Sequence, residues 1–194
     1  MNYISLDLEM NHDDHGRTRE VIQVGYVIGN SDTNEILATR RLYVKNQHTQ
    51  PLKPFIIELT GITDAHINDR GITMREIYGI ISEDMRQYDV FMNPITWGGG
   101  DSQELREWIN QEDPAIISDS EFGHYVFGRR WIDVKTLFVM DRMSKGWNYQ
   151  GGLKNACRKL RIPFEGPAHD ATQDALNTFK VFCYYMNRLA QKDQ

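Results

Sequence analysis

Two carboxylates at the end of the first apolar segment are well placed to hold a metal ion. Asp7 and Glu9 end a run that predicts a β-strand from Tyr3 to Leu8. Side chains alternate along a strand, so both carboxylates point the same way, roughly 7 Å apart at their backbones for a rise of ~3.4 Å per residue. That spacing suits one or two shared hard divalent cations. The alternative is a pair of solvated residues at a strand end.

A third carboxylate follows a second short apolar segment. Pro94 to Trp97 predicts a strand that ends in the glycines 98–100, and Asp101 then begins a predicted helix through Leu105 and Trp108. Glycines permit close approach by a ligand. The alternative role for Asp101 is helix N-cap, which is common for Asp.

A histidine and a fourth carboxylate lie at the start of the last predicted helix. His169 and Asp174 are five residues apart, so they would not share a face of one ideal helix. They can converge if His169 lies in the loop before the helix, where Gly166-Pro167 predicts a break. Asp170 then becomes the N-cap. The alternative for His169 is a surface histidine.

The elements that must position these residues predict an α/β fold. Three strands come first, and strands then alternate with helices, which indicates a mixed sheet flanked by helices. Thr73 with Glu76 predicts a capping box. The expected strands are Tyr3–Leu8, Val21–Ile28, Ile36–Val44, Pro94–Trp97 and Trp131–Val134; the expected helices are Thr73–Tyr88, one from Asp101, one through Leu137 and Met140, Gly151–Leu160 and Ala171–Leu189.

Composition limits the classes of function. The 194 residues carry a formal net charge of −5, whereas proteins that hold nucleic acid by its phosphates alone are usually basic. An enzyme whose positive charge comes from bound metal remains compatible with this balance. Cys157 and Cys183 form no C-x-x-C pair, and no signal peptide or membrane span is visible, so we expect a cytoplasmic protein.

Taken together, these segments resemble the DEDDh branch of the DnaQ-like 3′→5′ exonucleases. The resemblance runs from about Tyr3 to Ala190, with the motifs in the family's order. It implies a single exonuclease domain over residues 1–194, with a ribonuclease H-like fold and a five-stranded mixed sheet. The matching stretches are Ser5-Leu-Asp-Leu-Glu-Met10, Thr96-Trp-Gly-Gly-Gly-Asp101, His169-Asp-Ala-Thr-Gln-Asp-Ala175, Glu58-Leu-Thr-Gly-Ile62, and Gly152 through Gly166.

The resemblance also implies roles for the site residues. Asp7, Glu9, Asp101 and Asp174 become the metal ligands, and His169 becomes the general base. Two Mg²⁺ ions, for which Mn²⁺ can substitute, would support in-line hydrolysis of a phosphodiester to nucleoside 5′-monophosphates. An imidazole with an ordinary pKa of ~6.5 suits a base at neutral pH.

Substrate contacts are expected beside this site. Met10 and Asn11 would lie near the 3′-terminal nucleotide, and Leu59, Thr60 and Ile62 could pack against its base; ordinary core packing is the alternative for Leu59 and Ile62. Two stretches interleave aromatic residues with cations, as single-strand-binding surfaces do, although packing is the alternative for each. These are Tyr125, Phe127, Arg129, Arg130 and Trp131, and Lys145, Trp147 and Tyr149.

The expected partner is therefore the 3′ end of a single-stranded nucleic acid. RNA is favoured over DNA, because Trp97-Gly98 before Asp101 is similar to the subgroup that trims RNA ends. Alternatives are a DNA-directed exonuclease of the same fold, a catalytically weak nucleic-acid-binding module, an endonuclease or phosphoesterase with the same acidic site, and an interaction protein that uses Glu112 to Arg130.

Overall fold

A five-stranded mixed sheet forms the centre of the molecule. The computed structural model describes residues 1–12, 19–45, 50–113, 115, 130–147 and 151–190. The sheet order is β3-β2-β1-β4-β5, with β1 antiparallel to β2, β2 antiparallel to β3, and β4 and β5 added in parallel. The strands are β1 (Asn2–His12), β2 (Arg19–Asn30), β3 (Ile36–Tyr43), β4 (Ile95–Thr96) and β5 (Ile132–Asp133). The predicted five-stranded mixed sheet is confirmed.

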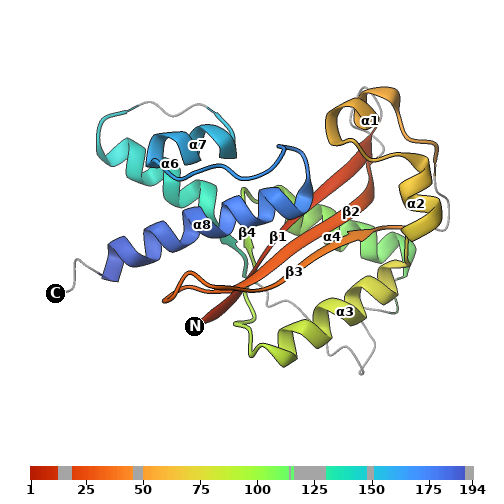
Figure 1. The fold of residues 1–194 in the computed structure, drawn as a ribbon, viewed down its shortest axis with the longest axis horizontal. Helices are drawn as coiled ribbons and strands as arrows, with labels where there is room; N and C mark the ends of the chain where they lie inside the picture. The colour runs from red at the N-terminus through yellow and green to blue at the C-terminus, as the bar shows by residue number, and fades with distance from the viewer. Residues whose placement is uncertain (13–18, 46–49, 114, 116–129, 148–150, 191–194) are drawn as a thin grey trace.

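Helices cover both faces of this sheet (Figure 1). In that view α8, α6 and α7 lie above the strands, α3 lies below them, and α1 and α2 lie at one end. The helices are α1 (Pro54–Thr60), α2 (Asp64–Arg70), α3 (Met74–Gln87), α4 (Gly100–Glu112), α6 (Val134–Ser144), α7 (Leu153–Leu160) and α8 (Ala171–Ala190).

The alternation of β1 separates two hydrophobic cores. Ile4, Leu6 and Leu8 are at most 6% exposed and pack with α3 and α4, as the sequence predicted for the face away from the carboxylates. Tyr3 points the other way and packs with α6, α7 and α8. Asp7 and Glu9 have the same parity as Tyr3, so β1 directs them to the α8 side.

Two short helices were not predicted as separate elements. Helix α1 begins at Pro54 and ends at Thr60, and its C-cap Gly61 takes φ 71°. Helix α2 is capped by Thr63, whose side chain accepts from the backbone N–H of His66. Seven residues give too little periodicity to predict a helix, although the family resemblance implied one near residues 58–62. The predicted capping box of Thr73 and Glu76 is present on α3.

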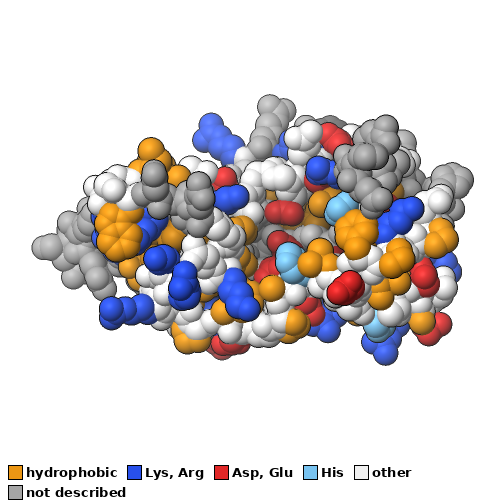
Figure 2. Space-filling view, turned by 90° about the horizontal axis from the view of Figure 1, so that it is seen from above, with side chains coloured by type: hydrophobic (Ala, Val, Ile, Leu, Met, Phe, Trp, Pro, Cys, Tyr) orange, Lys and Arg blue, Asp and Glu red, His pale blue; other side chains and the backbone are white. Residues whose placement is uncertain are grey.

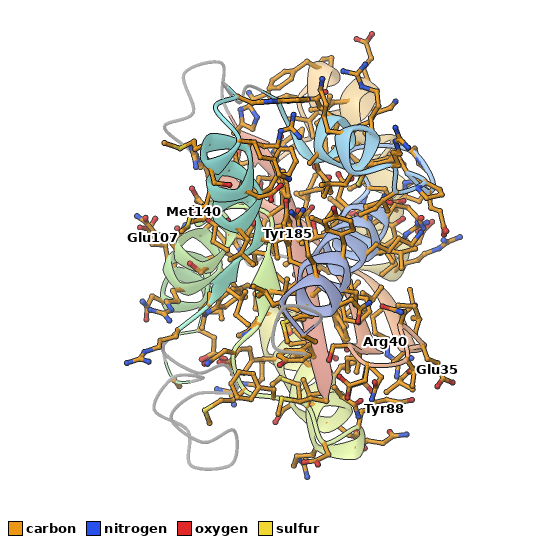
Figure 3. The ribbon with its side chains drawn as sticks, turned by 90° about the vertical axis from the view of Figure 1, so that its left-hand side faces the viewer. Glu35, Arg40, Tyr88, Glu107, Met140 and Tyr185 are labelled. Carbon is orange, nitrogen blue, oxygen red and sulfur yellow. The ribbon has the colours of Figure 1, made fainter. Side chains whose placement is uncertain are left out.

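A buried polar group fastens α3 to the sheet. The Asp84 carboxylate accepts a hydrogen bond from the Tyr26 hydroxyl at 2.7 Å and two from Arg40, at 2.8 Å from Nε and 2.9 Å from Nη2. Figure 3 places Arg40 and Tyr88 at the same end of the molecule, where α3 finishes. These bonds leave the buried Tyr26 hydroxyl satisfied and hold α3 against β2 and β3.

No helix within the described residues is long and apolar enough to cross a lipid bilayer.

Candidate active site

The first two carboxylates project from β1 toward α8. Glu9 is 8% exposed, and Asp7 is half-buried beside it. Asp7 pairs with Gly25 and Glu9 with Gln23 across the β1–β2 ladder, which then shifts register between Glu9 and Met10. Such a bulge bends a strand and redirects its side chains. Glu9 therefore lies directly beside the bulge in β1, and Asp7 lies two residues before Glu9.

Gly25 lets α8 approach the sheet closely. A Cβ atom built on Gly25 would lie 2.2 Å from the carbonyl carbon of Ala171 and 2.2 Å from the backbone nitrogen of Thr172. Backbone atoms cannot move aside as a flexible side chain can. The first turn of α8 thus rests directly on β2 beside Asp7, and this contact brings Asp174 toward β1.

Side chains from three places hold the start of α8. Gln23 on β2, which is 2% exposed, accepts a hydrogen bond from the backbone N–H of Ala171 at 2.9 Å. Asp170 accepts from the N–H groups of Thr172 and Gln173 at 3.1 and 3.3 Å, so its predicted N-cap role is confirmed. Asp170 also forms an ion pair with Arg41 on β3. The helix start is therefore tied to two strands.

A left-handed residue brings the histidine back to the fourth carboxylate. His169 takes φ 62°, a conformation unusual for residues other than glycine and costing on the order of 1–2 kcal/mol. Its backbone N–H donates to Asp174 Oδ2 at 2.9 Å. One ligand atom each of Glu9, His169 and Asp174 lie within 4.8 Å of one another. The five-residue spacing thus converges as predicted, with His169 in the loop and Asp174 on the helix.

The loop from β4 to α4 positions Asp101, which lies in the first turn of α4. Gly98 in this loop takes φ 99°; its carbonyl accepts from the Thr96 hydroxyl at 2.7 Å, and its N–H donates to Asp133 Oδ1 at 3.0 Å. Gly99 occupies the N-cap position of α4, so the alternative of Asp101 as the N-cap is wrong. Asp101 lies in the first turn instead, with its carboxylate available to the site.

Electrostatics indicate that these carboxylates face one another. Burial raises the pKa of Asp7 well above its usual range, and the charges of Asp101, Glu9 and Asp174 raise it further. Burial, together with Asp174 and other neighbours, raises the pKa of Glu9 to about 8. Burial likewise raises the pKa of Asp101 to about 7. The pKa of Asp174 is raised by burial, and hydrogen bonding and charge from His169 oppose that rise.

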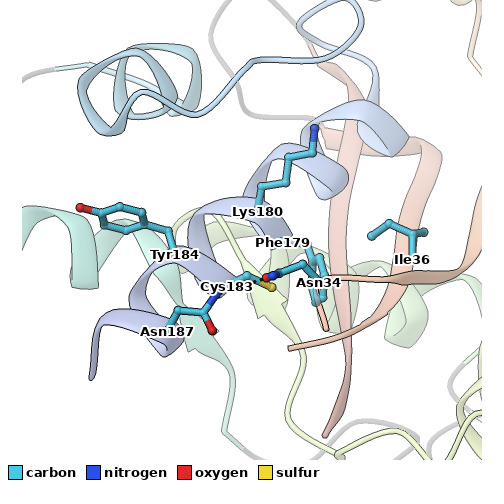
Figure 4. Close-up of a pocket in the computed structure, with 7 residues that line it drawn as sticks. All are labelled: Asn34, Ile36, Phe179, Lys180, Cys183, Tyr184 and Asn187. Carbon is cyan, nitrogen blue, oxygen red and sulfur yellow. Dashed lines mark hydrogen bonds between the residues drawn. The ribbon is translucent and has the colours of Figure 1, made fainter. Parts of the chain in front are cut away.

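The site opens on one face of the molecule. Figure 2 shows Asp and Glu side chains and a His side chain gathered in a hollow near the middle of that face. A different hollow of about 280 Å³ lies between α8 and the β2–β3 connection (Figure 4). Its lining includes Phe179, Lys180 and Cys183 and contains no carboxylate, so it is no candidate metal centre.

The expected substrate residues lie in different environments. Leu59 on α1 is 45% exposed. Ile62 is 3% exposed and packs in a hydrophobic core, which agrees with the alternative of ordinary core packing for this residue. The Thr60 hydroxyl donates to the carbonyl of Ile56. Met10 is half-buried against the core under α3 and α4.

Asn11 is buried, and its side chain is occupied by protein contacts. Its amide donates to Glu20 Oε2 at 3.3 Å and to the Pro51 carbonyl at 3.4 Å, and its oxygen accepts from Lys53 N–H at 3.1 Å. Only its backbone could therefore contact a ligand without breaking these bonds.

The two aromatic and basic stretches are described only in part. Tyr125, Phe127, Arg129 and Tyr149 lie outside the described residues, Arg130 and Lys145 are exposed, and Trp131 is half-buried against the core. Trp147 is 53% exposed, and its ring lies 3.7 Å from the Arg142 guanidinium carbon.

Three positioning residues were not predicted from sequence. Gln23 and Gly25 hold α8, and Asp133 both accepts from Gly98 and caps α6 through the backbone N–H of Thr136. A glycine inside a strand pattern is a signal of close backbone approach, so Gly25 offered a clue. Nothing in the sequence indicated the bond between Gln23 and α8 or the bond between Asp133 and Gly98, because these partners are remote in sequence.

Comparison with known proteins finds exonucleases among those that this chain resembles. An exonuclease family model matches residues 4–91. Human ERI1 exoribonuclease 2 is 24% identical over 180 residues, which cover 87% of this chain and 25% of that protein; the mouse protein of the same name is 25% identical over 181 residues with the same coverage. The chain thus spans about a quarter of the length of these relatives.

Solved structures share the arrangement of elements. A full-length 3′-exonuclease superposes with a TM-score of 0.79 at 20% identity, covering 96% of this chain and 60% of its own. The nuclease domain of 3′hExo, a DEDDh family member bound to rAMP, superposes with a TM-score of 0.75 at 20% identity, covering 96% and 92%.

The sheet order, the flanking helices and these superpositions define a ribonuclease H-like α/β domain. Within that fold, the chain is similar to exonucleases: the exonuclease family model matches residues 4–91, and the human and mouse relatives are named exoribonucleases.

Proposed function

We propose that this protein is a metal-dependent 3′→5′ exonuclease that releases nucleoside 5′-monophosphates from the 3′ end of single-stranded nucleic acid, with RNA favoured over DNA. One observation carries the proposal. Ligand atoms of Glu9, His169 and Asp174 lie within 4.8 Å of one another, and the charges of Glu9, Asp101 and Asp174 raise the pKa of Asp7. Similarity to an exonuclease family model and to a protein named an exoribonuclease supports the same activity.

The chemistry of the donor set suits hard divalent cations. Asp7, Glu9, Asp101 and Asp174 would hold two Mg²⁺ ions, with Mn²⁺ as a substitute, since carboxylate oxygens are the ligands these ions prefer. The raised carboxylate pKa values support this role, because clustered negative charge without a cation is unfavourable. When bound, two such ions relieve charge on the phosphate and make water a better nucleophile. A structural neighbour described as the Mg²⁺- and Mn²⁺-bound form of S. pombe Pop2p is compatible with this choice.

His169 is the proposed general base. Its side chain is exposed at the mouth of the site and lies beside Glu9 and Asp174. A ring nitrogen of a neutral imidazole can accept the proton of the attacking water. The backbone N–H of His169 donates to Asp174 Oδ2, and this bond holds the backbone of the histidine beside the carboxylates.

The terminal nucleotide would lie beyond the end of β1. Exposed Leu59 is the residue on α1 best able to contact the last base, with Thr60 and Ile62 supporting the turn that follows it. Met10 and Asn11 follow Glu9, and we propose that their backbone lies near the 3′-hydroxyl.

The preference for RNA rests on relatives. The human and mouse relatives are named exoribonucleases, and one structural neighbour concerns 3′-end specific recognition of a histone mRNA stem-loop by a 3′-exonuclease. A DNA-directed exonuclease of the same fold is the second candidate, because no described residue distinguishes a 2′-hydroxyl.

Matched RNA and DNA strands labelled at the 5′ end test the proposal. With Mg²⁺ the protein should shorten the strands stepwise and release mononucleotides, RNA faster than DNA, and a blocked 3′ end should stop it. Chelation should abolish the reaction. Glu9→Gln should reduce the rate by at least about a hundredfold, whereas Glu83→Gln on α3, an exposed position, should not. Internal cleavage, or unchanged release by Glu9→Gln, would overturn the proposal.

A further inference from the structure

A basic groove lies on α7, outside the carboxylate site. It has a volume of about 700 Å³ and is lined by Gly152, Lys154, Asn155, Arg158, Ile162 and Phe164. Lys159 and Arg161 add two further exposed cations at the end of the same helix, and α7 contains no acidic residue. The whole chain carries a net charge of −5, yet these four cations lie within eight residues. The surface of α7 is therefore locally positive on an acidic protein.

The cations of this groove are available to a ligand. Across the part of the chain that the structure describes, no carboxylate forms an ion pair with Lys154 or Arg158. Lys154 Nζ lies 5.8 Å from the centre of the Phe164 ring, and Arg158 donates to the neutral Asn155 side chain at 2.8 Å. Among the residues that the structure describes, the groove thus presents two cations without an ion pair, together with the half-buried ring of Phe164.

A short, hydrogen-bonded segment joins the groove to the loop that carries His169. Phe164 precedes His169 by five residues, so their backbones are at most about 18 Å apart at ~3.6 Å per residue. The buried Asn177 side chain holds this connection: it accepts from the N–H of Glu165 at 3.0 Å and donates to the Glu165 carbonyl at 2.9 Å. Figure 2 shows Lys and Arg side chains gathered beside the hollow, over the α6 and α7 part of the molecule.

We propose that this groove binds the phosphates of the substrate strand upstream of its 3′ end. The inference rests on the proposed exonuclease function and adds where the rest of the strand lies. A carboxylate cluster repels a polyanion except where cations neutralise it, so a strand entering the site needs a separate positive surface. Basic grooves with an aromatic ring are the features that hold single strands without reading their sequence.

The double variant Lys154→Gln/Arg158→Gln tests the groove. It should raise KM for a single strand of about ten nucleotides and leave kcat unchanged. The KM of a dinucleotide without a 5′-phosphate should also stay unchanged, because its one phosphate is the scissile one and it has no upstream phosphate for the groove to bind. Two lost phosphate contacts should lower the log–log slope of affinity against salt by about 1.4. Raising salt from about 50 to about 200 mM should therefore weaken strand binding by the wild type about sevenfold more than by the variant.

A matched control removes two exposed cations elsewhere. Lys45→Gln/Arg86→Gln changes net charge equally, next to β3 and on α3, and should leave the long-strand KM unchanged. Equal effects of both pairs, or no effect of the α7 pair, would overturn the groove and leave the exonuclease function intact. Strand binding that weakens in the α7 variant, measured by anisotropy, without any release of mononucleotides by the wild type would instead support the groove and overturn the function.

Discussion

The contact between Gly25 and the start of α8 allows a quantitative test of how the site is assembled. In Gly25→Ala the new Cβ would lie 2.2 Å from two backbone atoms, against 3.4 Å at the near limit of ordinary contact, so α8 must move by about 1 Å. Asp174 moves with the helix, away from Asp7 and Glu9. A misplacement of about 1 Å can cost about a hundredfold in rate.

The assay follows both activity and folding. For Gly25→Ala we expect kcat for mononucleotide release to fall about a hundredfold, while overpacking costs about 2 kcal/mol of unfolding free energy. For a chain of this size that corresponds to a fall of about 4–8 °C in Tm. Far-UV circular dichroism should stay close to that of the wild type, because the movement is local.

Gly99→Ala provides the matched control. A Cβ at Gly99 meets no atom within 4 Å, and its φ of −88° suits alanine, although the residue lies two positions from Asp101. Its rate should stay within about threefold of the wild type. A folded Gly25→Ala protein with wild-type kcat would refute the reasoning. If that variant does not fold, Gln23→Ala, which removes the bond to the Ala171 N–H, should still lower kcat.

The other predictions concern charge and loop position. Because the pKa values of Glu9 and Asp101 are raised to about 8 and about 7, the metal-free folded state binds more protons than the unfolded chain; its Tm should therefore fall as pH rises from about 4.5 to 8. Mg²⁺ should reverse much of that fall, adding about 2.7 kcal/mol at a hundredfold excess over Kd, and a flat metal-free profile would contradict the clustering. His169→Asn, which tolerates the left-handed backbone, should lower kcat strongly and remove the acidic limb of the pH–rate profile with metal present; persistence of that limb would exclude the histidine as base. Asp133→Ala should cost about 1 kcal/mol through the lost α6 cap and also lower kcat by releasing the Gly98 loop, whereas Thr136→Ala should affect stability alone; equal kcat in the two would refute a positioning role.

Much of the local structure could be predicted from sequence. The apolar alternation of β1 predicted that Ile4, Leu6 and Leu8 would be buried and that Asp7 and Glu9 would share the other side, which the structure confirms. These features depend on a few neighbouring residues and the period of a strand. The seven-residue helices α1 and α2 were missed because they are shorter than two helical repeats.

The assembly of the site required more than local pattern. The convergence of the acidic residues was an expectation from family resemblance, and the alternative of Asp101 as an N-cap remained open until Gly99 was seen in that position. The roles of Gln23 at α8 and of Asp133 at the Gly98 loop were not predicted, since each depends on a residue at least 35 positions away. A glutamine and an aspartate are common residues in any sequence, and only the contacts that they make in the folded protein show that they position the site.

By itself, the sequence determined which side chains could bind a cation, which face of β1 would carry them, and that Asp170 would cap the last helix. Only the tertiary structure decided that Asp174 and His169 meet Glu9, because that meeting depends on the backbone of α8 resting against a glycine on β2 and on one left-handed residue. Contacts of this kind join segments more than 140 residues apart, and no local preference of either segment specifies them.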